Sequence, residues 1–60
     1  MANPSFEERE AQRALRAAFA AVIVAEEKCR AADYGSEVRA TCEEARKAIA
    51  YAVALVEGRV

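Results

Sequence analysis

The apolar residues of this 60-residue chain are arranged symmetrically about one short stretch, Asp33-Tyr34-Gly35-Ser36. At equal distances from the junction of Gly35 and Ser36, Cys29 is matched by Cys42. The further matched pairs are Val22 with Ile49, Leu15 with Val56, Ala18 with Ala52, Ala25 with Ala45 and Ala32 with Val38. Such mirror symmetry is expected when two helices of similar length fold back on each other at the centre. It therefore predicts an antiparallel helical hairpin.

Within each half of the chain, apolar residues recur at alternating spacings of four and three, which is the heptad pattern of packed helices. Sixteen alanines and only two glycines and one proline also favour long helices over strands. We predict an all-α chain forming one domain, residues 1–60, with helices over about 4–33 and 36–57 and a turn at 34–35. The predicted hairpin core consists of Leu15, Ala18, Val22, Ala25, Val38, Ala45, Ile49, Ala52 and Val56.

The start of the first helix can be read in two ways. Asn3-Pro4 offers an N-cap followed by proline at the first helical position, where its missing N–H costs nothing. Ser5 with Glu8 offers a competing capping box. Both readings place the start of the helix within the first six residues of the chain.

Glycines mark the two predicted helix ends. Gly35 is expected in the left-handed conformation that stops the first helix, with Ser36 as N-cap of the second. Gly58 is expected to close the second helix in the same way.

The apolar face of each predicted helix is wider than one neighbouring helix can cover. Phe19 and Ile23 extend it on the first helix, and Val53 and Leu55 on the second. We therefore expect these four residues to form an oligomer interface, most simply a homodimeric four-helix bundle, with higher oligomers also open. The alternative is a protein-binding module that presents this flank to a different partner.

Cys29 and Cys42 are the chemically distinctive residues, and the symmetry places them opposite each other. Closely packed helices bring facing residues near the separation that a disulfide needs, so we predict an interhelix disulfide. Two reduced thiols packed as small apolar groups are the alternative. A metal site would need four soft ligands, and with no histidine and no CxxC spacing we predict none.

The composition argues against several classes of function. Without histidine, a glycine-rich phosphate loop or a layered fold that could form a cleft, we expect no enzyme activity, cofactor or small-molecule substrate. A net charge of −1 disfavours nucleic acid and anionic membranes as partners. The longest apolar runs have nine residues, which is too short for a membrane span. No targeting segment is recognisable, so we expect a cytoplasmic location if the chain is natural and recombinant expression if it is designed.

Charged residues fall on the outer sides of the predicted helices. Glu26 precedes Arg30, and Glu43 precedes Lys47, at the i, i+4 spacing that favours surface ion pairs. A basic stripe also runs along one flank of the first helix, through Arg9, Arg13 and Arg16. Because glutamates are interleaved with it, we interpret it as a solvated face rather than a nucleic-acid contact.

In length, hairpin topology and small core residues the chain resembles the Rop-type dimeric helical hairpins, which bind RNA loop pairs. That resemblance implies a four-helix bundle, with RNA binding as a less favoured alternative function, and no functional residue can be carried over from it. In its regular caps, glycine stops and paired surface charges the chain is also similar to computationally designed helical hairpins. This second resemblance implies a self-assembling structural scaffold, a homo-oligomer stapled by a disulfide.

Overall fold

The computed structural model describes residues 5–58, and its first helix, α1 (Phe6–Ala31), begins directly after Ser5. Ser5 has extended backbone angles (φ −68°, ψ 168°), and its hydroxyl oxygen accepts a hydrogen bond from the N–H of Glu8 at 3.2 Å. The hydroxyl also donates to the Glu8 carboxylate at 3.3 Å. The cap therefore forms at the second of the two predicted starts, whereas Asn3-Pro4 lies outside the described residues.

The turn between the helices differs from the predicted one. The left-handed residue is Asp33, with φ 60°, which follows the C-cap residue Ala32. Gly35 is extended (φ −65°, ψ 177°) and takes the N-cap position of α2 (Ser36–Val56), so Ser36 is the first residue inside that helix. The predicted roles of Gly35 and Ser36 were therefore wrong. Aspartate tolerates left-handed backbone better than most residues, so the first helix can end before the glycine is reached.

The end of the second helix agrees with the sequence. Gly58 has φ 72°, and its N–H donates to the carbonyl of Leu55 at 3.2 Å. The glycine therefore stops α2 in the left-handed conformation that was predicted for it.

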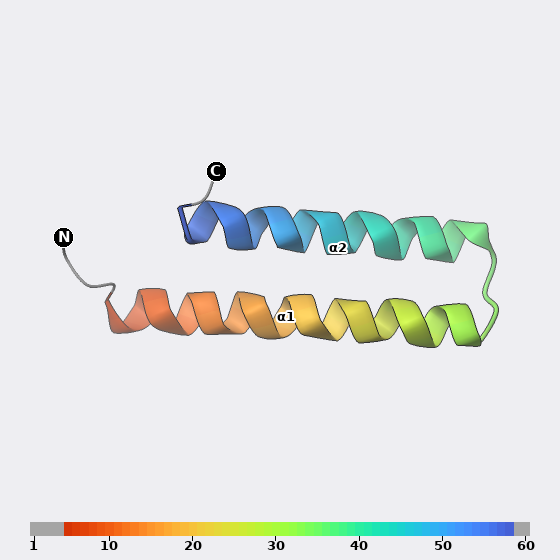
Figure 1. Ribbon diagram of the computed structural model, residues 1–60, viewed down its shortest axis with the longest axis horizontal. Helices are drawn as coiled ribbons and strands as arrows, with labels where there is room; N and C mark the ends of the chain where they lie inside the picture. The colour runs from red at the N-terminus through yellow and green to blue at the C-terminus, as the bar shows by residue number, and fades with distance from the viewer. Residues whose placement is uncertain (1–4, 59–60) are drawn as a thin grey trace.

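Over residues 5–58 the fold is a helical hairpin, with α1 and α2 antiparallel and side by side (Figure 1). The molecule measures 47 × 19 × 11 Å, so it is two helices wide and one helix thick. A single layer of helices has no interior, and among the described residues only Val53 is buried, at 6% exposure. The other seam residues are half-buried.

The seam between the helices is rotated relative to the predicted core. It contains Leu15, Phe19, Val22, Glu26 and Cys29 of α1 facing Cys42, Arg46, Ile49 and Val53 of α2, with Glu57 following that helix. Of the predicted core residues, Ala18 and Ala52 are half-buried at the edge of this seam, whereas Ala25, Val38, Ala45 and Val56 are exposed.

The rotation of the seam has a physical reason. A rotation that brings Phe19 and Val53 between the helices buries more apolar surface than a layer of alanines does.

Candidate functional site

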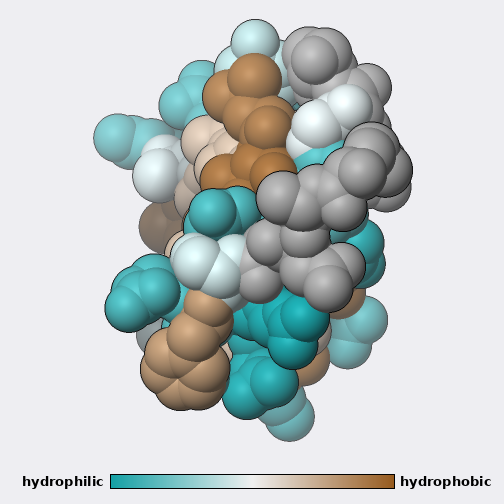
Figure 2. All heavy atoms as spheres, turned by 90° about the vertical axis from the view of Figure 1, so that its left-hand side faces the viewer, coloured by the Kyte–Doolittle hydropathy of each residue, from teal (hydrophilic) through white to brown (hydrophobic). Residues whose placement is uncertain are grey.

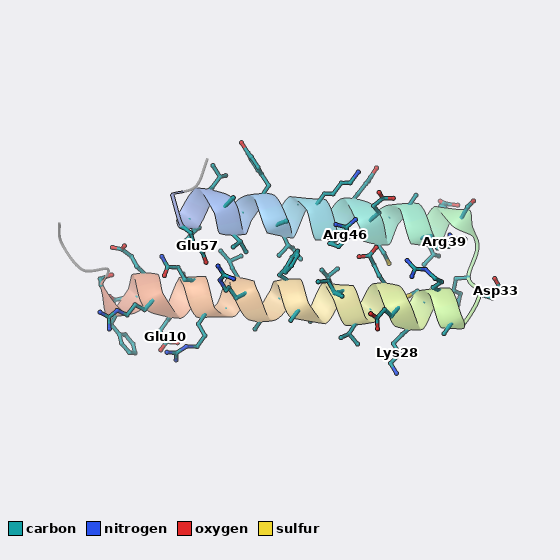
Figure 3. All side chains as sticks on the ribbon, in the orientation of Figure 1. Glu10, Lys28, Asp33, Arg39, Arg46 and Glu57 are labelled. Atoms are coloured by element: carbon teal, nitrogen blue, oxygen red, sulfur yellow. The ribbon has the colours of Figure 1, made fainter. Side chains whose placement is uncertain are left out.

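Two ion pairs cross between the helices and extend the seam beyond its apolar residues. The Arg16 guanidinium donates to both carboxylate oxygens of Glu57, at 2.7 and 2.6 Å. The Nε of Arg46 lies 2.8 Å from the carboxylate of Glu26, whose side chain is only 16% exposed. Figure 3 shows Arg46 on α2 and Glu57 just after the end of α2, both on the side that faces α1.

The Glu26–Arg46 pair replaces the predicted pair of Glu26 with Arg30, which is not formed within residues 5–58. A signal for it was present in the sequence, because Glu26 and Arg46 interrupt the apolar patterns of the two halves at nearly equal distances from the turn. The other predicted pair is confirmed, with 3.3 Å between Lys47 and Glu43.

The predicted basic stripe is partly neutralised. Arg16 donates two hydrogen bonds to the Glu57 carboxylate, and these bonds, together with the carboxylate's charge, raise the pKa of Arg16 above its ordinary value. Arg13 pairs with Glu10 at 3.5 Å. The stripe therefore presents less positive charge than its sequence suggests.

Cys29 and Cys42 meet near the turn end of the seam. Both are free thiols and both are half-buried, with their side chains within hydrogen-bonding reach of each other. They share an open groove with three arginines, Arg30, Arg39 and Arg46.

Removal of solvent raises the pKa of the Cys42 thiol, and the neighbouring Cys29 raises it further through its charge and its hydrogen bond. The carboxylate of Glu26 acts in the same direction. A raised pKa lowers the thiolate fraction, so Cys42 is a weak nucleophile at neutral pH.

Within the part of the chain that the structure describes, no three potential metal ligands come together. Neither helix combines the length and the apolarity that a membrane crossing requires.

The four residues predicted for an oligomer interface lie in different environments. Val53 is buried in the seam of its own chain and Phe19 is half-buried beside it, where the two line a small hollow with Arg16 and Ala50. The heptad phase turns both side chains toward the seam, so Val53 is removed from the outer surface and Phe19 is only partly exposed. Ile23 and Leu55 remain 37% and 52% exposed.

The two broad sides of the hairpin differ sharply in chemistry. The helical repeat, taken from the seam residues, assigns each remaining position to one side. One side, here called the charged face, contains Arg16, Ile23 and Arg30 of α1 with Arg39, Glu43, Ala50 and Ala54 of α2, and Glu57 beyond it. The grooves agree with this assignment, since Arg30, Arg39 and Glu43 line one of them together.

The opposite side is uncharged over most of its length. This alanine face contains Ala14, Ala18, Ala21 and Ala25 of α1 with Val38, Thr41, Ala45, Ala48, Ala52 and Val56 of α2, and Leu55 at its edge. Figure 2, which looks at the end of the hairpin that carries both termini, shows apolar surface gathered over α2. Leu55 and Val56 belong to this end of α2 and are both largely exposed.

Comparison of the chain with protein-family models, with curated proteins and with solved structures finds no match.

Proposed function

We propose that this chain is a structural, self-assembling helical hairpin that buries apolar surface against further copies of itself and has no catalytic role. The observation that carries this proposal is the near absence of a core. Val53 is the one buried residue among residues 5–58, while eight large apolar side chains are more than one third exposed. The core of a chain this short rarely contributes more than about 3–5 kcal/mol, and small proteins commonly add a partner, a metal or a disulfide.

The amount of exposed surface supports the same proposal. The accessible surface is 4808 Å², whereas a compact monomer of 6.5 kDa exposes roughly 3,800 Å². The excess of about 1,000 Å² is similar to the roughly 800 Å² that each partner loses in a standard protein interface. One self-association event would bring the chain close to the surface of an ordinary globular protein.

Sedimentation equilibrium over a hundredfold range of protein concentration tests this proposal. We expect a discrete oligomer, most simply a dimer with four helices, whose mass is independent of concentration above its dissociation constant. A chain that stays monomeric throughout this range would contradict self-assembly. That result would favour the second candidate function, a hairpin whose exposed surface binds a different protein.

The proposal includes a disulfide between Cys29 and Cys42 as a staple of the hairpin. The thiols already face each other across the seam. Oxidation by dissolved oxygen or a small disulfide would remove two protons and two electrons and form one S–S bond. Closing so short a loop contributes about 3 kcal/mol in the chain-entropy model.

Intact mass spectrometry before and after reduction tests the staple. We expect the unreduced chain to be lighter by two hydrogens, and the Cys29→Ser variant to show no such difference. Equal masses for the wild-type chain after exposure to air would contradict the staple and leave two packed thiols.

A further inference from the structure

We infer that the alanine face, and not the charged face, is the surface through which one hairpin binds a second copy of itself. This inference rests on the proposed self-assembly and specifies its interface. It differs from the interface predicted from the sequence, because Val53 is buried within its own chain and Ile23 lies among the charged residues of the other side.

Charge distinguishes the two faces. An interface on the charged face would enclose Arg30, Arg39 and the Arg16–Glu57 pair. Removing such charges from water costs several kcal/mol per ion unless each is well paired. The central part of the alanine face, from Ala14 to Ala25 and from Val38 to Val56, carries no charge and so avoids this cost.

Side-chain size leads to the same choice. Alanine at successive turns of both helices gives a flat surface, on which another layer of helices can approach at the close end of the 8–10 Å range. Val38 and Val56 are exposed toward opposite ends of α2 and provide larger side chains that can fit between the small ones.

The dimensions favour a second hairpin over a single helix as the occupant. Over the length of α2, whose 21 residues span about 32 Å, the hairpin is 19 Å wide, which gives a broad side of roughly 600 Å². This area approaches the roughly 800 Å² that each partner of a standard interface loses. A single helix of about 10 Å diameter would cover only half of that width. A second copy has the matching width and the same uncharged surface, and a twofold axis between the copies closes the assembly.

Single substitutions can test which of the two faces forms the interface between copies. Ala25→Glu and Ala45→Glu each place a carboxylate on the alanine face, at positions that are exposed in the single hairpin. Ala17→Glu makes the same change on the outer side of α1, eight residues before Ala25, and serves as the matched control. Ile23→Glu places the carboxylate on the charged face.

The dissociation constant of each variant is measured by sedimentation equilibrium, and circular dichroism reports its helix content. We expect Ala25→Glu and Ala45→Glu to raise the dissociation constant at least about 100-fold, because each dimer would bury two unpaired carboxylates. Ala17→Glu and Ile23→Glu should change it less than about threefold. Because all the replaced side chains are at least one third exposed in the single hairpin, loss of helix content at high concentration would itself report loss of the assembly.

The possible results separate the interface from the assembly. An oligomer that survives Ala25→Glu and Ala45→Glu but dissociates with Ile23→Glu would overturn the alanine face as the interface and leave self-assembly intact. Unchanged dissociation constants in all four variants would likewise overturn it. A wild-type chain that is monomeric at every concentration would overturn both.

Discussion

Replacing Val53 by alanine should lower the free energy of unfolding by about 1 kcal/mol. The change removes two buried carbons, worth about 0.8 kcal/mol each, at the most buried position among residues 5–58. Alanine is the better helix former by roughly 0.5 kcal/mol, which offsets part of that loss. The two effects together leave a net destabilisation of about 1 kcal/mol.

The matched control is Val24→Ala, at a position that is 51% exposed on the outer side of α1. About half of the transfer free energy is lost there, and the gain in helix propensity nearly cancels it, so the net effect should be close to zero. Urea unfolding of the reduced protein, followed by helical circular dichroism, measures both variants.

The comparison also tests the position of the seam. If Val53 lies between the helices of one chain, its replacement destabilises the protein even at concentrations below those at which copies associate. An effect seen only where the chain self-associates would instead place Val53 between copies. Equal stability of the Val53 and Val24 variants would refute the described seam.

Three further predictions concern the turn, the half-buried pair of Glu26 and Arg46, and the thiols. Asp33→Gly should stabilise the hairpin by up to about 1 kcal/mol, because glycine adopts the left-handed backbone at φ 60° without steric cost, and urea unfolding measures this. A double-mutant cycle on Glu26 and Arg46, each replaced by glutamine, should give a coupling energy of about 1 kcal/mol that decreases with added salt; zero coupling would show that the 2.8 Å contact contributes nothing. Cys29→Ala should lower the pKa of Cys42, since it removes a neighbouring charge and a hydrogen bond, and thiolate absorbance against pH would measure the shift.

Because the pKa of Cys42 is raised in the folded hairpin, the free energy of unfolding of the reduced protein depends on pH. The folded hairpin holds this thiol protonated more strongly than the unfolded chain does. The contribution of this thiol to the free energy of unfolding is therefore complete below the ordinary cysteine pKa of about 8.5. It is lost as the pH rises through the higher pKa that Cys42 has in the folded hairpin.

The helical hairpin could be predicted from the sequence by itself, because its signals are local. Heptad spacing, the Ser5 hydroxyl cap and the glycine stop at Gly58 each involve residues within about one turn of one another. The facing of Cys29 and Cys42 also follows from the sequence, since a turn at the centre of symmetry brings residues at equal distances from it together. Even there, the identity of the left-handed residue was not determined, because both Asp33 and Gly35 can adopt that backbone.

Only the tertiary structure decided how far each helix is rotated about its axis. The sequence offered two adjacent stripes, one through Ala25 and Ala45 and one through Phe19 and Val53, and their heptad spacings are equally regular. The choice depends on which stripe buries more apolar area and completes the Glu26–Arg46 pair when the helices meet. That comparison involves residues far apart in the chain, and its outcome leaves the alanine face uncovered.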